Sequence, residues 1–144
     1  EYNLPVHIFR LPGIYGPGRS ICEKIKTNQY VIKKEDHFFS RVHAEDIAFA
    51  IQASINNPTP GEIFNLTDDV PERNDLVADY AAKLMNIKLE KIDINDKRVS
   101  EKVLDFYKEN KKVSNTKIKN ILSWSPKFKN YKIGINEILR RSND

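Results

Sequence analysis

Hydrophobic residues have a strand-like pattern near the start of the sequence and helical patterns over most of the remaining chain. Residues 5–10 form a short β-rich run, and its apolar content comes from Val6, Ile8 and Phe9. A short apolar run of this kind is typical of a strand that is buried in a parallel sheet. We therefore expect residues 5–10 to form such a strand.

The later elements alternate between helix and strand. Apolar residues recur at helical spacing in two longer segments, 44–55 and 73–86, and a strand-like run at 62–67 lies between them. This order with short connections is typical of an α/β sheet. In chain order, the other expected elements are a short helix and then a strand at Tyr30–Ile32 within residues 21–34, a strand at 38–42, a helix marked by Val99, Val103, Leu104 and Phe106, a brief strand at 112–115, a short helix capped by Ser114 that contains Ile118 and Leu122, and a last helix at 131–141.

The spacing also predicts which faces of the two longer helices turn inward. Glu45 and Asp46 stand in the first turn of the helix at 44–55, where acidic residues suit the helix dipole, and His43 or Ala44 stands at its start. The predicted inward faces are Ile47, Ala48, Ile51 and Ile55 in the first helix and Leu76, Val77, Tyr80, Ala81 and Leu84 in the second.

The segment from Pro12 to Gly18 contains two prolines and three of the five glycines of the chain. Proline cannot donate to a sheet ladder, and glycine is favoured where the backbone needs a positive φ or approaches another group closely. We expect this segment to be a structured loop and not part of a strand or a long helix.

Composition places the chain among globular proteins. Hydrophobic residues make up 40% of the chain and charged residues 31%, and no apolar run approaches the ~20 residues that a membrane span requires. The formal net charge is +4, but the lysines are spread along the chain, which favours a solvated basic surface. We expect no membrane partner and do not favour nucleic acid, while a partner with phosphates or carboxylates stays open.

The cysteine content and the first residues bear on location and processing. Cys22 is the only cysteine, so an internal disulfide is impossible, which fits a reducing cytosol and predicts a cytoplasmic protein. Residues 1–9 contain a proline and a histidine and lack the cationic start of a signal peptide. Because the first residue is Glu1, we expect the sequence to begin inside a longer reading frame or after processing.

Motif-like segments succeed one another in a recognisable order. The string from Arg10 to Arg19 is Arg-Leu-Pro-Gly-Ile-Tyr-Gly-Pro-Gly-Arg, residues 42–48 are Val-His-Ala-Glu-Asp-Ile-Ala, and residues 62–67 are Glu-Ile-Phe-Asn-Leu-Thr. They resemble, in the same order, the Arg-x-x-x-(Val/Ile)-Tyr-Gly-Pro-Gly, Val-His-x-Asp-Asp-Val-Ala and Tyr/Phe-Asn-(Ile/Leu) segments of the extended short-chain dehydrogenases, the NAD-dependent epimerases and dehydratases. The end of the chain, with Lys112–Asn115, Leu122–Pro126 and Tyr131-x-x-Gly134, is similar to the tail of a smaller, atypical branch of that superfamily.

The resemblance implies an α/β fold that contains the C-terminal strands of an incomplete Rossmann-like sheet and a small, mostly helical substrate-side subdomain. We expect residues 1–87 to be the C-terminal part of the Rossmann-like NAD(P)-binding domain with an inserted substrate-side segment, and residues 88–144 to be the substrate-side subdomain. In that family the strand that ends at the position of Arg10 belongs to the Rossmann sheet, and open α/β sheets bind ligands at a topological switch point.

By the same resemblance, the backbone of Leu11, Pro12 and Gly13 would lie against the nicotinamide ring of NAD or NADP. Ile14 and Tyr15 would point toward the junction between cofactor and substrate.

The substrate candidates are Tyr15, Arg19, Arg41 and His43, and no catalytic residue or metal site is predicted. Arg19 and Arg41 suit an anionic group, because a guanidinium binds phosphate or carboxylate in a two-pronged geometry. We therefore expect a small-molecule substrate that is anionic or nucleotide-linked.

Each candidate has a structural alternative. The turn at Tyr15–Gly18 can simply shape a cleft. Arg10 can pair with a carboxylate beneath the sheet, and Arg41 can form a surface or structural ion pair. His43 can be a cap or a packed ring instead of an acid–base group, Asp46 can be a helix-terminus carboxylate, and Trp124 and Tyr131 can be packing residues.

The sequence lacks the Gly-x-x-Gly-x-x-Gly phosphate turn and the Tyr-x-x-x-Lys catalytic pair of that family. Tyr80 and Lys83 have the wrong spacing, and Tyr107 is followed at once by Lys108. In the family both motifs lie N-terminal to the strand that begins this chain. A nucleotide needs the amides of the first helix N-terminus to hold its pyrophosphate, so we expect this chain alone to bind no NAD or NADP.

Three functional hypotheses remain. The first is the C-terminal fragment of an NAD(P)-dependent epimerase, dehydratase or reductase, inactive alone, whose partner is the N-terminal Rossmann half or another subunit. The second is a non-catalytic module that binds a ligand or RNA, which the basic charge keeps open. The third is a non-functional remnant of a split gene.

Overall fold

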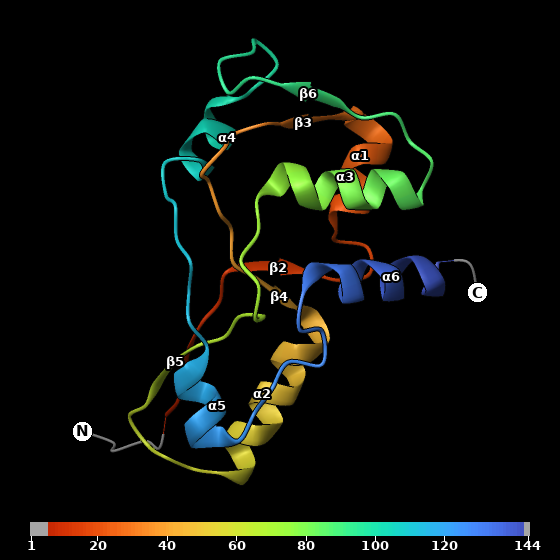
Figure 1. Cartoon of the computed structure of the whole chain (residues 1–144). Helices are drawn as coiled ribbons and strands as arrows, with labels where there is room; N and C mark the ends of the chain where they lie inside the picture. Colours follow the sequence, from red (N-terminus) through yellow and green to blue (C-terminus); the bar gives the residue numbers. More distant parts are fainter. Residues whose placement is uncertain (1–5, 143–144) are drawn as a thin grey trace.

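The computed structural model describes residues 6–142, which form a mixed α/β structure (Figure 1). The three strand pairs of this region are all parallel: β1 (Ile8–Arg10) with β5 (Ile63–Asn65), β2 (Gly13–Tyr15) with β4 (Arg41–His43), and β3 (Tyr30–Ile32) with β6 (Glu90–Ile92). The helices are α1 (Ile21–Asn28), α2 (Ala44–Asn56), α3 (Asn74–Leu84), α4 (Glu101–Phe106), α5 (Thr116–Leu122) and α6 (Tyr131–Arg141). Pro5 of the first expected strand lies outside the described residues, and no described helix is long and apolar enough to cross a membrane.

Part of the expected loop after Pro12 is a strand. Gly13–Tyr15 forms β2, and the amide of Gly13 donates to the carbonyl of Ser40 at 3.3 Å. The loop prediction was wrong for these residues because both prolines stand outside the ladder and remove no donor from it. The turn itself comes after β2: Gly16 and Arg19 exchange backbone hydrogen bonds, each of 3.0 Å, and Gly18 has a φ of 73°.

Two further expectations differ from the structure near residues 88–116. The segment at 90–92 is a strand, β6, which its charged composition concealed. Residues 112–115 form no strand, and α5 begins after Asn115 instead of Ser114. Asn115 is buried there because its side-chain amide donates to the carbonyl oxygen of Thr67 and to Oδ1 of Asp69, both at 2.8 Å.

The strands diverge after Arg10. Up to that residue β1 lies beside β5, and the amide of Leu66 still donates to the carbonyl of Arg10 at 3.1 Å. Beyond it, β4 stands between β2 and the continuation of β5, because the amide of Asp68 donates to the carbonyl of Arg41 at 2.7 Å. Such a divergence at the carboxyl ends of parallel strands is where open α/β sheets bind ligands.

The β1–β5 pair has one covered face and one bare face. Phe9 and Phe64 stack with ring centroids 6.0 Å apart, and both belong to the core cluster that α2 and α5 help to build. Ile8, which is 51% exposed, and Ile63 alternate with them on the uncovered face. The expected strand of a parallel sheet is present, but among the described residues only one of its faces is packed.

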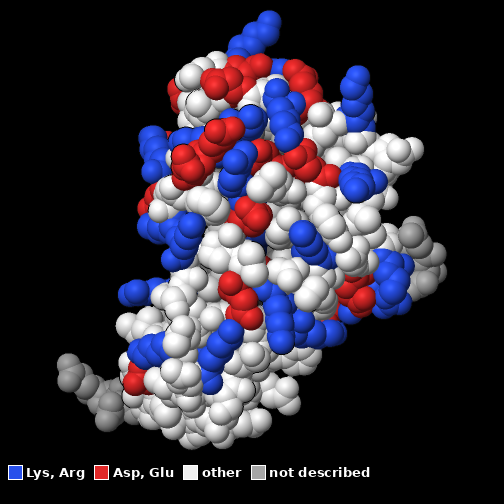
Figure 2. All heavy atoms as spheres, in the orientation of Figure 1, with Lys and Arg blue, Asp and Glu red and all other residues white. Residues whose placement is uncertain are grey.

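Helix α2 also leaves apolar residues uncovered. Its buried residues are Asp46 and Ala50, while the predicted inward residues Ile51 and Ile55 are exposed, Ile55 by 73%. Figure 2 shows few Lys, Arg, Asp or Glu side chains over the end of the molecule where α2 and α5 lie.

Helix α3 turns a face of small residues inward. Val77, Ala78, Ala81 and Ala82 are buried in the core that α3 shares with α1 and α6. The predicted face included Leu76 and Leu84, which are exposed, so the prediction was shifted around the helix.

Candidate functional site

A cleft of about 1320 Å³ lies where the strands diverge, between β2 and the helices α1, α4 and α6. Six of the predicted site residues line it: Leu11, Pro12, Gly13, Tyr15, Arg19 and Arg41. Arg10 and Asn65, the last residues of β1 and β5, line it too. The cleft therefore opens at the carboxyl ends of two parallel strands, as the resemblance implies.

Leu11 and Pro12 form an exposed stretch of backbone along one wall. Within the described part of the chain, neither residue is engaged in a backbone hydrogen bond. A Cβ added at Gly13 would lie 3.5 Å from the carbonyl oxygen of Ser40, which is ordinary contact, so packing inside the chain does not demand glycine there. The wall offers free backbone polar groups next to apolar surface, which suits a flat ring that carries an amide.

Arg41 reaches the cleft from β4 and holds three segments together. One Nη donates to the carbonyls of Phe39 and Glu72, both at 2.9 Å, and the other donates to Oδ1 of Asn74 at 3.3 Å. No carboxylate of the described residues lies within salt-bridge distance of it. The structure therefore does not show Arg41 in the alternative role of an ion pair. Among the described residues, no carboxylate pairs directly with the guanidinium that Arg41 brings to the cleft.

Two more arginines add positive charge. Arg10 and Arg19 are exposed at the cleft, and neither forms a salt bridge with a described residue. The proposed pairing of Arg10 with a carboxylate beneath the sheet is therefore not present in this part of the chain. Three guanidiniums that line one cleft without carboxylate partners among the described residues favour an anionic ligand.

Tyr15 borders the cleft but buries its hydroxyl group. Its side chain is 8% exposed, and its Oη has no hydrogen-bond partner among the described residues. Burial, and after it the charge of Asp68, raises the pKa of Tyr15 well above its ordinary value. A Cβ at Gly134 of α6 would clash with this Oη, so glycine at 134 is what lets the ring enter.

Asp68 is a buried carboxyl that the sequence pattern did not reveal. It is 2% exposed, its Oδ1 accepts from the amide of Val70 at 3.2 Å, and its Oδ2 has no partner in the described structure. Burial raises its pKa to about 7, although the nearby charge of Arg41 acts in the opposite direction. A lone Asp after a strand is typical of an exposed turn, so no signal in the sequence indicated that Asp68 would be buried.

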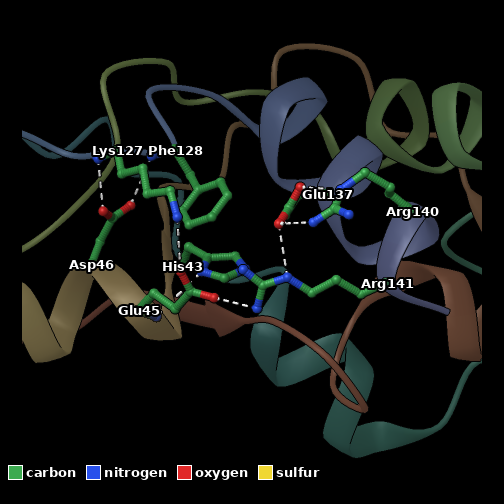
Figure 3. Close-up of polar contacts among 8 residues, drawn as sticks. All are labelled: His43, Glu45, Asp46, Lys127, Phe128, Glu137, Arg140 and Arg141. Carbon is green, nitrogen blue, oxygen red and sulfur yellow. Dashed lines mark hydrogen bonds and ion pairs between the residues drawn. The ribbon is translucent and has the colours of Figure 1, made fainter. Parts of the chain in front are cut away.

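His43 does not line the cleft and lies close to Glu45 and Phe128 (Figure 3). It is fully buried, its Nδ1 accepts from the amide of Glu45 at 3.2 Å as the N-cap of α2, and its ring lies 3.8 Å from that of Phe128. Its Nε2 has no partner among the described residues. Burial lowers the pKa of His43. The structure therefore shows His43 as a helix cap and a packed ring, which was the structural alternative to an acid–base group.

Asp46 anchors the start of α2 to the segment before α6. Its two carboxylate oxygens accept from the amides of Lys127 and Phe128 at 2.7 and 3.1 Å (Figure 3). Its carbonyl accepts from the indole of Trp124 at 3.2 Å. Asp46 is thus a helix-terminus carboxylate with a tertiary role. Trp124 and Tyr131 are buried packing residues, as expected.

Some residues of the cleft were not predicted. Asn74 at the start of α3 and the α4 residues Lys102 and Phe106 line it, together with Tyr107. The alternation of charged and apolar residues at 88–112 gave no indication of which side chains would face a ligand. Among residues 6–142, no group of His, Cys, Asp or Glu side chains could hold a metal ion.

No family model matches the chain, and no curated protein matches it. Among solved structures, a functionally unknown conserved protein from Silicibacter pomeroyi is 39% identical, with a TM-score of 0.90 over 96% of this chain and 50% of its own. The dTDP-glucose 4,6-dehydratase of Bacillus anthracis, solved with NAD, is 20% identical, with a TM-score of 0.73 over 99% of this chain and 46% of its own. The UDP-glucose 4-epimerase of Thermotoga maritima, solved with UDP-glucose, is 15% identical, with a TM-score of 0.66 over 96% of this chain and 47% of its own.

The chain has the fold of the C-terminal part of the Rossmann-like epimerases and dehydratases. It spans about half the length of each of these three structures. The epimerase/dehydratase fold accounts for the cleft at the ends of β1 and β5, and it accounts for a sheet that is present only in part.

Proposed function

We propose that the chain is the C-terminal half of an NAD(P)-dependent epimerase, dehydratase or reductase of the short-chain dehydrogenase superfamily. In this proposal it supplies the nicotinamide-side wall and the substrate cleft, and it has no activity alone. The observation that carries the proposal is the position of the cleft: it opens at the carboxyl ends of β1 and β5, next to a sheet face that nothing in the described chain covers.

The bare surfaces support a missing half at a definite place. The crossover from β1 through α2 to β5 joins parallel strands, and such connections are right-handed. If a further parallel strand lay at the free edge of β1, a second right-handed crossover would connect it to β1. The helix of that crossover would lie on the same side of the sheet as α2. The residues that this helix would cover are those of the predicted inward face of α2 that the described chain leaves exposed: Ala48, Ile51 and Ile55.

The wall formed by Leu11, Pro12 and Gly13 fits a nicotinamide. Its free backbone groups can pair with the carboxamide, and Pro12 lacks an amide that would otherwise need a partner. When bound, the nicotinamide supplies or accepts the hydride. This chain holds only that end of the cofactor, because its sequence lacks the glycine-rich turn that would hold the pyrophosphate.

Arg19 and Arg41 bind the anionic part of the substrate in this proposal, and Tyr15 shapes the floor between cofactor and substrate. The similar structures are named for dTDP-glucose and UDP-glucose, and both of these compounds carry a diphosphate of the kind that two guanidiniums can hold. A nucleotide-linked sugar is thus the substrate class we propose. The division into a Rossmann part at 1–87 and a substrate-side part at 88–144 belongs to the same proposal; the β3–β6 pair joins the two.

A ligand-binding module without redox chemistry is the second candidate. It is favoured by the cationic cleft, since Arg10, Arg19 and Arg41 are all present in this chain and need no other half to face an anion.

Calorimetric titration of the chain alone separates the two. We expect no heat of binding with NADH or NADPH, and binding of inorganic pyrophosphate that weakens as salt is raised. Micromolar binding of either dinucleotide by the chain alone would overturn the half-protein proposal. If the chain alone binds pyrophosphate and the addition of a second half confers no binding of NADH or NADPH, the binding module is favoured.

A further inference from the structure

Helix α4 presents an exposed aromatic ring to the cleft. None of its six residues is buried, and Phe106, its last residue, is 58% exposed. The ring of Phe106 lies parallel to that of Phe39, with centroids 4.6 Å apart and an angle of 9° between the planes. Both residues line the cleft. Phe39 therefore occupies one face of the Phe106 ring, and more than half of the residue remains exposed at the cleft.

A cation stands on the same side of α4. Lys102 precedes Phe106 by four residues, which places the two side chains on one face of the helix. Lys102 also lines the cleft, and it forms no salt bridge with a described residue. Asp105, the acidic residue beside Phe106, is paired with Lys108. The face of α4 that meets the cleft thus combines a flat apolar surface with an unpaired positive charge.

The attachment of α4 does not depend on Phe106. Tyr107 is 6% exposed, and its carbonyl accepts from Nζ of Lys34 at 3.3 Å and from Nε2 of His37 at 3.1 Å. Its ring also packs edge-on against Phe39, with centroids 5.3 Å apart. Tyr107 therefore fixes this end of α4 by contacts that do not involve Phe106.

We propose that Phe106 is a specificity-determining residue that stacks on the nucleobase of a phosphorylated ligand, while Lys102 attracts its phosphate. The inference rests on the proposed function in one respect: it assumes that the arginine-lined cleft binds the anionic part of a substrate. It adds the residue that recognises the aromatic part. Aromatic stacking accepts any base, so the site selects for a base without selecting strongly among bases.

The test compares two probes that differ only by the base, uridine 5′-monophosphate and ribose 5-phosphate, titrated into the 144-residue chain. We expect the nucleotide to bind about tenfold more tightly than the sugar phosphate. In F106A the two should bind equally, with the affinity for ribose 5-phosphate unchanged. F106L keeps apolar bulk without a flat face and should lose the preference, whereas F106Y should keep it.

The outcomes separate this inference from the proposed function. Equal binding of both probes by the wild type, or an unchanged preference in F106A, overturns the stacking site but leaves the anionic cleft intact. Failure of both probes to bind overturns the stacking site and the anionic cleft together. Urea unfolding of each variant checks the fold, and because Phe106 is largely exposed we expect F106A to stay folded.

Discussion

Gly134 packs so closely against Tyr15 that a side chain at position 134 would overlap the tyrosine ring. A Cβ at position 134 would overlap Oη, Cε2 and Cζ of Tyr15, the farthest of them at 2.7 Å. Gly134 lies inside α6, where helix propensity alone favours alanine by about 1 kcal/mol. Contact with a buried ring acts against that preference.

We therefore predict that G134A destabilises the chain, by roughly 1–3 kcal/mol. The matched control is the same change in a Tyr15→Ala background, where the ring is gone and propensity should make G134A neutral or stabilising. Urea unfolding of the four variants measures the coupling. If G134A has the same effect in both backgrounds, the two residues do not constrain each other.

Asp68 should make stability depend on pH in an unusual direction. Its folded pKa, about 7, is raised above the unfolded value because of burial, so its contribution is complete below ~4 and is lost as pH rises through 7. We predict that D68N is progressively more stable than the wild type between pH 5 and 8, by at most ~1.4 kcal/mol per pH unit.

Asp69 supplies the matched control. Burial acts to raise its pKa, but hydrogen bonds from Asn115 and Lys119 hold the pKa below its ordinary value. D69N should therefore lose stability relative to the wild type, and the loss should be greatest at neutral pH and diminish in acid. Chemical unfolding across the pH range gives both curves, and a difference between D68N and wild type that is constant with pH would contradict the assignment.

The uncovered face of α2 should cause self-association of the chain alone. Ile51 and Ile55 are exposed, so replacing them with lysine should leave the fold intact and reduce association measured by sedimentation velocity. Phe49 is the control, because it is also exposed but lies on roughly the opposite side of the helix. If F49K reduces association as much as I55K, the α2 face that contains Ile51 and Ile55 is not the surface that causes self-association.

Arg41 and Arg19 should separate stability from anion binding. In R41M the carbonyls of Phe39 and Glu72 lose their donors, which should cost roughly 1–3 kcal/mol of stability as well as pyrophosphate affinity. R19Q should weaken pyrophosphate binding with a stability within about 0.5 kcal/mol of the wild type, since Arg19 is exposed and unpaired among the described residues. Unchanged pyrophosphate binding in R19Q would remove Arg19 from the proposed site.

The sequence predicts the elements better than it predicts their inward faces. The bounds of α6 and the strand at Tyr30–Ile32 agree with the expectation, since capping residues and β-branched runs act locally. Part of the α2 face that was predicted as buried is exposed: Ile51 and Ile55 are uncovered, whereas Ile47 packs against the core. The inward face of α3 consists mainly of alanines, so its larger exposed leucines misled the prediction.

The candidate site shows the same division. Leu11, Pro12, Gly13, Tyr15, Arg19 and Arg41 come together in the cleft because the motif that contains most of them is one continuous stretch. Asp68 and Phe106 could not be predicted, since burial of one carboxyl and exposure of one ring are decided by tertiary contacts with no periodic signal. His43 stands in a family-like motif, but its ring packs against Phe128 and does not line the cleft.

The most direct test combines the chain with the half that we propose completes it. The Silicibacter pomeroyi protein is 39% identical to this chain over half of its own length, so the half that this chain does not match is a suitable complement. We predict that neither piece binds NADH alone, and that the mixture forms a 1:1 complex that binds it and protects the α2 face from hydrogen exchange. A mixture that neither associates nor binds NADH, while the intact relative does, would contradict the account.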